Sequence, residues 1–241
     1  MNFETFVLVA STGDLAEEPT AREHADAVEY RMDLADAPLE ALDAYSGALP
    51  LIATNRPVWE GGERPDGNDR AAELEAAIDV EAVEAVDVEL GALADAEKAV
   101  ADLAGVVEKA VANDVSVIVS THDFESTPSL SELAELGAQV CTVGDVGKVA
   151  VTAENPGNVL DLLRVTHEFT AAGRAIATMA MGQVGAHSRA VAPLYGSKIG
   201  YGAVRPDDRT APGQYDVATL GRLVAELQGG QETEADESST A

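Results

Sequence analysis

Eight short apolar runs, each separated from the next by a polar stretch of helical character, restrict the fold of this chain more than any other feature. Runs of this length suit strands buried on both faces, as in parallel sheets covered by helices. Parallel neighbours cannot be joined by a tight turn, so each pair needs a crossover connection. The predicted strands are Phe6–Ala10, Ala27–Met32, Leu49–Thr54, Ala85–Leu90, Val115–Ser120, Val146–Val151, Ala175–Met179 and Lys198–Val204.

The polar stretches between these runs carry helix start and stop signals. Ser129 with Glu132 forms a capping-box pattern, and Asn155–Pro156 is typical of an N-cap followed by proline. Gly137 and Gly173 are interpreted as helix ends. The predicted helices are Glu18–Asp26, Pro38–Ser46, Asp69–Val83, Leu93–Asn113, Leu130–Gly137, Pro156–Ala172 and Tyr215–Leu227, with a short one expected within Gly182–Gly196.

Eight strand-and-helix units predict a single-domain α/β protein, a closed parallel (β/α)8 TIM barrel over residues 1–228. An open doubly wound sheet is the alternative. It is less attractive because the turn Ser11–Leu15, after the first strand, has no glycine-rich phosphate loop. Residues 229–241 are polar and acidic, so we expect a disordered tail.

The charge balance excludes several classes of partner. The chain carries 43 Asp and Glu against 15 Lys and Arg, a formal net charge of −28. Such a field repels phosphate backbones and anionic lipids, so we expect neither nucleic acid nor membrane as a partner. No apolar run approaches the roughly 20 residues of a transmembrane helix. The start contains Glu4 and no basic region, unlike a signal peptide. We therefore expect a cytoplasmic protein.

Metal and disulfide chemistry find no support in the sequence. Cys141 is the single cysteine, so no intrachain disulfide can form. The sequence contains no HExxH, no CxxC and no clustered set of His and Cys. The acids of Glu60–Glu63 are weak evidence for a cation site. From these patterns we expect no metal site.

One of only four lysines lies in the middle of a predicted strand. Lys148 belongs to the apolar run Val146–Val151, whereas Lys98 and Lys109 fall in a helical stretch. Burial of an unpaired ammonium is costly, and desolvation or a nearby cation lowers the pKa of a lysine. A neutral amine is a nucleophile toward a ketone and forms a Schiff base with it. The structural alternative, a strand-end lysine paired with an acid, fits the pattern equally well.

A histidine and three arginines follow predicted strands. His122 comes after the fifth strand, next to the strand of Lys148, and an imidazole there can act as general base and then general acid. Arg31, Arg56 and Arg189 are expected at the same end of the barrel, where catalytic groups gather. Because a guanidinium binds carboxylates in a bidentate manner, they indicate an anionic substrate. A structural histidine and arginines paired with local acids are the alternatives.

Taken together, these segments resemble the type I 3-dehydroquinate dehydratases of the shikimate pathway, from the first strand to about Gln214. The resemblance rests on the order and spacing of several motifs. They are Glu29–Asp33, Arg56 with Glu60–Glu63, His122–Phe124 with Thr127–Pro128, Gly147–Val151, Met179–Gly182, Ser188–Arg189, Tyr195–Ser197 and Ala211–Gln214. The resemblance implies dehydration of 3-dehydroquinate to 3-dehydroshikimate, in aromatic amino-acid biosynthesis, without metal or cofactor. It also implies a homodimer.

The resemblance further implies roles for single residues. Lys148 would form an iminium at the C3 ketone, and His122 would remove the C2 proton and protonate the departing C1 hydroxyl in a syn elimination. Arg189 would bind the substrate carboxylate. Substrate contacts are implied for Glu29, Arg31, Arg56, Glu60, Met179, Tyr201, Thr210, Gln214 and, more weakly, Ser11. Thr210 and Gln214 would belong to a loop that closes over the substrate.

Some positions depart from the family pattern, and two other functions remain open. Tyr201 and Thr210 stand where phenylalanine and serine are common, and the loop Arg205–Arg209 is slightly longer than usual. A class I Schiff-base aldolase would share the fold and the lysine, but no phosphate site for a sugar phosphate is found. A metabolite-binding barrel without activity is the other alternative, and intact Lys148 and His122 argue against it.

The acidic surface generates a first prediction. We hypothesise a salt-loving cytoplasm, such as that of a halophilic archaeon, in which concentrated cations screen the repulsion among 43 acidic side chains. The melting temperature is therefore expected to rise from low to molar KCl, measured by calorimetry on one preparation. Equal melting temperatures in both solutions would contradict the hypothesis.

Overall fold

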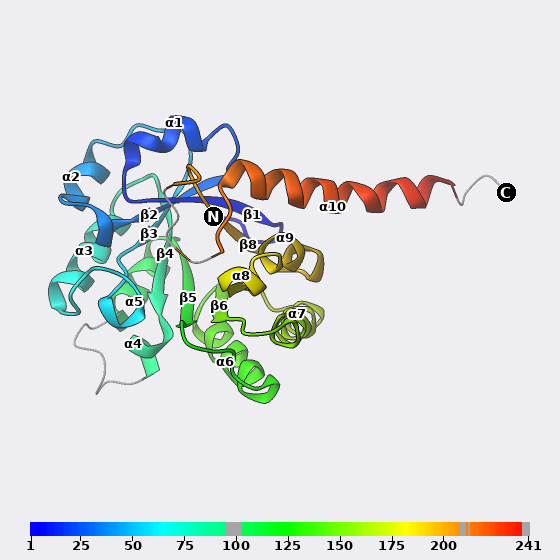
Figure 1. Ribbon diagram of the computed structural model, residues 1–241. Coiled ribbons are helices and arrows are strands. Elements are labelled where there is room, and N and C mark those ends of the chain that lie inside the picture. Colours follow the sequence, from blue (N-terminus) through cyan, green and yellow to red (C-terminus); the bar gives the residue numbers. More distant parts are fainter. Residues whose placement is uncertain (95–102, 208–210, 212, 238–241) are drawn as a thin grey trace.

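A computed structural model describes the backbone of residues 1–94, 103–207, 211 and 213–237 (Figure 1). Eight parallel strands form a nearly closed barrel, in the order β7-β6-β5-β4-β3-β2-β1-β8. β8 approaches β7 at one end, where the Lys198 backbone N–H donates to the Ile176 carbonyl at 2.8 Å. The strands are β1 Val7–Thr12, β2 Ala27–Arg31, β3 Leu51–Thr54, β4 Val83–Glu89, β5 Ser116–Asp123, β6 Val146–Thr152, β7 Ile176–Met181 and β8 Ile199–Ala203. The barrel prediction is confirmed, and the open doubly wound sheet is excluded.

Helices surround the barrel, as the alternating pattern predicts (Figure 1). The α-helices are α1 Glu18–Ala21, α2 Pro38–Asp43, α3 Asn68–Ile78, α4 Leu90–Ala94, α5 Leu103–Ala112, α6 Leu130–Val143, α7 Pro156–Ala171, α8 Gly182–Gly185, α9 Ser188–Val191 and α10 Val217–Glu237. Short 3-10 turns are η1 Leu15–Glu17, η2 Met32–Leu34, η3 Val58–Glu60 and η4 Ala192–Tyr195. In the described part of the chain, no helix is long and apolar enough to cross a membrane.

The helix boundaries confirm most of the signals and correct one. Capping boxes start α6 at Ser129 and α7 at Asn155, and Gly173 follows α7 with a φ of 74°. Gly137 does not end α6, which continues to Val143. A Cβ at this buried glycine would lie 2.9 Å from the Phe169 ring of α7, so Gly137 provides room for helix packing instead.

Two predictions, one for a helix and one for the tail, involve residues that the structure describes only in part. Of the helix predicted over Leu93–Asn113, the described residues contain the end of α4, to Ala94, and α5 from Leu103, while residues 95–102 are not described. The helix α10 leaves the barrel and projects away from it (Figure 1). It runs through the first part of the expected tail to Glu237, so that part is helical here. Disorder of the tail in solution stays a prediction.

Inward side chains change from apolar to polar along most of the strands. Because side chains alternate across a strand, every second residue faces the barrel interior. A cluster of small and branched residues fills the N-terminal half of the interior, and the next inward residue is polar on most strands. The successive pairs are Val9 and Ser11, Ala27 and Glu29, Ile52 and Thr54, Ala85 and Asp87, Ile118 and Ser120, and Val146 and Lys148. The polar level lies toward the C-terminal ends of the strands, where barrels place their active sites.

Strand register places the lysine and the histidine on neighbouring strands. Ser120 on β5 pairs with Lys148 on β6, and His122 pairs with Ala150. His122 is therefore one inward position further along β5 than the residue opposite Lys148. The helix α6 packs closely on β6, because Gly147 has no side chain: a Cβ there would lie 2.5 Å from Val140 and 2.7 Å from the Cys141 sulfur.

A test of this packing follows. Gly147→Ala is expected to destabilise the fold by about 1–3 kcal/mol, because the added methyl group overpacks the contact between α6 and β6. Urea unfolding would measure the change. Gly229→Ala in α10 is the matched control, since a Cβ there meets nothing within 4 Å and alanine favours a helix. Equal stability of Gly147→Ala and the wild type would contradict the argument.

Candidate active site

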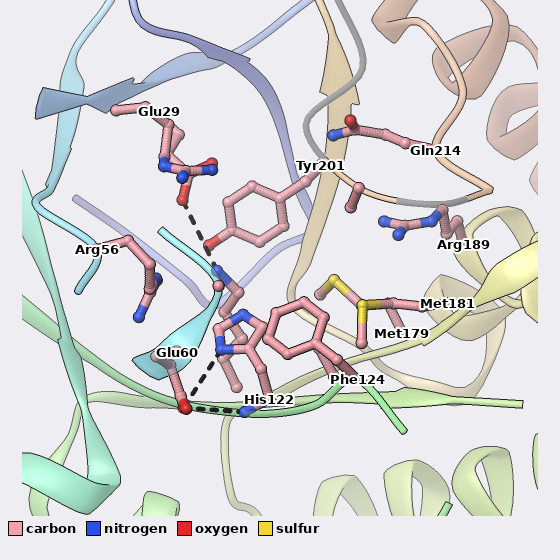
Figure 2. Close-up of a pocket in the computed structure, with 15 residues that line it drawn as sticks. Glu29, Arg56, Glu60, His122, Phe124, Met179, Met181, Arg189, Tyr201 and Gln214 are labelled. Carbon is pink, nitrogen blue, oxygen red and sulfur yellow. Dashed lines mark hydrogen bonds and ion pairs between the residues drawn. The ribbon is translucent and has the colours of Figure 1, made fainter. Parts of the chain in front are cut away.

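A pocket opens at the C-terminal ends of the strands and gathers side chains from all around the barrel (Figure 2). In Figure 2, Arg189 and Gln214 lie on the opposite side of the pocket from Arg56 and Glu60. The lining residues are Glu29, Arg31, Arg56, Glu60, Gly61, His122, Phe124, Lys148, Ala150, Met179, Met181, Arg189, Tyr201, Ala211 and Gln214. Most of the sequence-predicted site residues are therefore brought together in one cavity.

Lys148 lies at the floor of the pocket and is only 4% exposed. Its Nζ donates to Oδ2 of Asp87 at 3.0 Å and lies 3.7 Å from Oε1 of Glu29. The ring of Tyr201 covers the amine, with 4.2 Å between Nζ and the ring centroid. The lysine thus combines a position in the lining of the cavity with the ion pair that the structural alternative requires. It must release a proton from this paired state before it can attack a carbonyl.

His122 occupies the adjacent wall and is held by Glu60. Its backbone N–H donates to Oε1 of Glu60 at 3.0 Å, and its Nδ1 lies 3.5 Å from the same oxygen (Figure 2). The imidazole stacks on the ring of Phe124 at 5.7 Å between centroids. Burial, reinforced by the cations Arg56 and Lys148, holds the pKa of His122 well below its ordinary value. A neutral imidazole beside the amine can accept a proton.

Glu60 shares this buried environment. Burial raises the pKa of Glu60 to about 7, although Arg56 and the His122 backbone N–H act in the opposite direction. The 3-10 turn η3 presents Glu60, and the following Gly61 adopts a left-handed φ of 80°. The resemblance implies a substrate contact for Glu60, and the structure adds a contact between Glu60 and His122.

Glu29 forms a second anionic point of the pocket. Thr54 donates to its Oε1 at 3.1 Å, and Ser11 donates to its Oε2. Ser11 is 1% exposed and does not line the cavity, so the structure places it behind Glu29. Arg31, two residues along β2, makes a bidentate ion pair with Asp33 at 2.8 and 2.6 Å. The expected contact between Ser11 and the substrate stays a prediction, and in the structure Ser11 contacts Glu29.

Arg56 is the centre of a buried charge network. It lies 2.8 Å from Asp87 Oδ1 and 2.8 Å from Glu89 Oε1, and is 4% exposed. Arg70 of α3 binds the other oxygen of Glu89 at 2.8 Å. Sequence reasoning missed Asp87, Glu89 and Arg70. The alternation of side chains along a strand could have identified the two acids, because they occupy the same inward face of β4 as Ala85.

Arg189 differs from the other arginines because its charge is unmatched among the described residues. It is 4% exposed, and its Nε and Nη2 have no hydrogen-bond partner there. Burial lowers the pKa of its guanidinium to about 10. A buried, uncompensated guanidinium that lines a cavity is suited to an anionic ligand.

The remaining predicted contacts lie near Arg189 or outside the described chain. Gln214 and Met179 line the cavity and are 4% and 6% exposed. Tyr201 is buried, its hydroxyl has no partner among the described residues, and burial raises its pKa well above the ordinary value. Thr210 lies outside the described residues, so its predicted contact stays a prediction.

The fold and the site together define a (β/α)8 barrel with a buried amine, a neutral imidazole and a buried arginine, unpaired among the described residues, in one pocket. A family model described as type I 3-dehydroquinase matches residues 6–231. The chain belongs to this family.

Two relatives from halophilic archaea, both named 3-dehydroquinate dehydratase, are similar over nearly their whole length. The protein of Halobacterium salinarum is 53% identical over 228 residues, which cover 95% of this chain and 100% of the relative. That of Haloarcula marismortui is 54% identical over 228 residues, covering 95% and 99%.

Solved structures of the same family share the architecture. The 3-dehydroquinate dehydratase of Geobacillus kaustophilus superimposes with a TM-score of 0.80 at 28% identity, over 94% of this chain and 92% of that one. The type I enzyme of Clostridium difficile, solved with covalently modified comenic acid, gives a TM-score of 0.80 at 27% identity, over 94% and 93%.

The environment of Glu60 predicts a pH-dependent stability. Its pKa is raised from 4.5 to about 7 in the fold, so ionisation costs more there than in the unfolded chain. Its contribution to stability is full below about pH 4.5 and is lost as pH rises through about 7. Relative to the wild type, Glu60→Gln should therefore gain roughly 2–3 kcal/mol between about pH 5 and pH 8. Urea unfolding at constant ionic strength measures this difference. Parallel pH curves for the two proteins would contradict it.

Proposed function

We propose that this chain catalyses the dehydration of 3-dehydroquinate to 3-dehydroshikimate by a syn elimination through a Schiff base at Lys148. The observation that carries the proposal is the position of Lys148 and His122 on adjacent strands, both lining the pocket that also contains Arg189. Membership of the type I family supports the same reaction. No metal or cofactor is part of the proposed mechanism.

The lysine supplies an electron sink. Its deprotonated amine attacks the C3 carbonyl carbon, the carbonyl oxygen leaves as water, and a C=N bond forms at Lys148. The resulting iminium acidifies the C2 proton, because the electron pair released from C2 is delocalised onto nitrogen as an enamine. The Clostridium difficile relative, with its covalently modified ligand, indicates that a site of this family accepts covalent chemistry.

The histidine moves the protons. His122 lies next to Lys148 in the register of β5 and β6 and is held neutral by its surroundings, so it can take the C2 proton. It then returns this proton to the departing C1 hydroxyl, which leaves as water. Water finally attacks the imine carbon and releases the conjugated product from Lys148. One residue that serves as base and then as acid on one face accounts for a syn elimination.

The remaining side chains position the substrate. Arg189 binds the carboxylate, because it is the buried arginine of the pocket whose Nε and Nη2 are unpaired among the described residues. Glu29, Arg31 and Arg56 contact the ring hydroxyls and the ketone, while Met179 and Tyr201 pack against the ring. Gln214 and Thr210 belong to a segment that closes over the substrate and excludes water.

The cellular compartment and the oligomeric state are also proposed here. We place the enzyme in the cytoplasm, on the basis of its acidic composition and biosynthetic role, and we assign it as a homodimer by family resemblance. An aldolase would share the Schiff base but has no use for Arg189 together with the Gln214 segment. A binding protein without activity would not need a neutral His122 at the amine.

Covalent trapping tests the function. Borohydride added in the presence of 3-dehydroquinate should reduce the Schiff base and leave a stable adduct on Lys148, located by mass spectrometry of peptides. Lys148→Ala should give no adduct, whereas Lys198→Ala, at the opposite end of the barrel, should still give one. Absence of an adduct in the wild type would contradict the proposal.

Turnover separates the roles of the two residues. His122→Ala should still be trapped by borohydride but should form the conjugated product about 10²–10⁴-fold more slowly, the usual cost of a lost acid–base group. Absorbance of the product measures the rate, and it also distinguishes dehydration from aldol cleavage. Full activity of His122→Ala would overturn the mechanism.

A further inference from the structure

We propose that Asp87 is the resident counterion of the covalent intermediate: it binds the nitrogen of Lys148 as a carboxylate and keeps the iminium protonated while C2 loses its proton. The inference rests on the proposed function, because it requires Lys148 to be the Schiff-base residue. Asp87 acts through Lys148, so its role is that of a positioning residue.

The carboxylate of Asp87 is divided between two kinds of partner. Oδ1 accepts from Ser120 at 2.6 Å and lies 2.8 Å from Nη2 of Arg56. Oδ2 is the oxygen that accepts from Nζ of Lys148 at 3.0 Å. Asp87 is 0% exposed, so water does not compete for either oxygen. One oxygen is thus fixed by the barrel wall, while the other faces the amine.

Its surroundings keep Asp87 ionised. Burial alone would raise the pKa of this carboxyl, but Arg56, Lys148 and Ser120 outweigh burial and hold the pKa well below its usual range. Arg56 cannot easily leave, because Glu89 binds it from the other side at 2.8 Å. A carboxylate of such low basicity pairs with a cation without removing its proton.

This property is what the intermediate requires. When the amine becomes an iminium, the positive charge stays on the nitrogen of Lys148. The ion pair between this nitrogen and Asp87 is therefore kept. Loss of the C2 proton to His122 neutralises the nitrogen as an enamine, and departure of the C1 oxygen as water restores the charge. A more basic carboxylate at 3.0 Å would take the N–H proton and leave a neutral imine, which is a much weaker electron sink.

Glu29 is the competing candidate, and two observations favour Asp87. Glu29 lies further from the amine, at 3.7 Å against 3.0 Å. Glu29 also lines the pocket, whereas Asp87 does not, so a substrate would contact Glu29 and leave the ion pair of Asp87 intact. Besides Lys148 and Arg56, the titratable groups that act on this region are Glu29 on β2, Glu60 in η3, Glu89 on β4, His122 on β5 and Tyr201 on β8.

The test measures iminium protonation directly. A conjugated iminium absorbs at longer wavelength than the neutral imine, so the complex with 3-dehydroshikimate can be titrated with pH in a spectrophotometer. In Asp87→Asn the midpoint should move to lower pH by about one unit or more, the effect of losing an opposite charge at this distance. The alkaline limb of kcat should move in the same direction, while borohydride still traps the adduct at lower pH.

Two further variants make the result specific. Glu89→Gln removes the same charge two residues along β4 without touching Lys148, and its midpoint should move by less. Ser120→Ala removes a donor from Asp87 and concentrates the negative charge on the amine, so the midpoint should move to higher pH. This upward shift decides the question if Asp87→Asn does not fold.

Each outcome has one meaning. An unchanged midpoint in folded Asp87→Asn, or an equal shift in Glu89→Gln, overturns the counterion assignment. The same holds for Ser120→Ala if its midpoint fails to rise. A wild type that gives no adduct and no product contradicts the proposed function instead, so the two failures are distinguishable.

Discussion

The ion pair between Lys148 and Asp87, inside the barrel, is the interaction on which the site depends. A lysine that is 4% exposed must have a compensating anion, and the nearest oxygen of Asp87 lies 3.0 Å away. That anion needs fixed partners of its own, which are Arg56, two residues after β3, and Ser120 on β5. The geometry of the amine is therefore set by a chain of charges that begins at Arg70 on α3.

The layered filling of the barrel interior explains how these charged side chains can be buried inside it. Apolar residues such as Ile118 and Val146 fill the interior below, and polar or charged residues occupy the next inward position on β1 to β6. Lys148, Arg56 and Arg70 face Glu29, Asp87 and Glu89, so positive and negative groups alternate. The free-energy cost of burying such a network is acceptable when its charges are paired. Removal of one charged side chain leaves its partner buried without a counterion. Among the described residues, Arg189 departs from this pairing, because its Nε and Nη2 have no hydrogen-bond partner.

Strand periodicity and local start signals made the barrel predictable, because they act over a few residues. The same locality explains the failures. Gly137 has the sequence signature of a helix end, yet its role depends on Phe169 of the neighbouring helix α7. Lys148 and His122 could be found because a charged or titratable group beside an apolar run is conspicuous. Asp87 and Glu89 were equally conspicuous on β4, but their partners come from other strands and from α3, which only the fold brings together.

The acidic exterior and the balanced interior respond differently to salt. Screening by concentrated ions acts on charges in contact with solvent, and it reaches buried pairs much less. The net charge of −28 is carried outside the paired network, whereas Asp87 and Arg56 are 0% and 4% exposed. Salt that relieves repulsion across the surface thus leaves the electrostatic field at Lys148 nearly unchanged. A barrel of this family can therefore accept a strongly acidic surface without changing the proton chemistry in its pocket, because the two sets of charges are separated by the strands themselves.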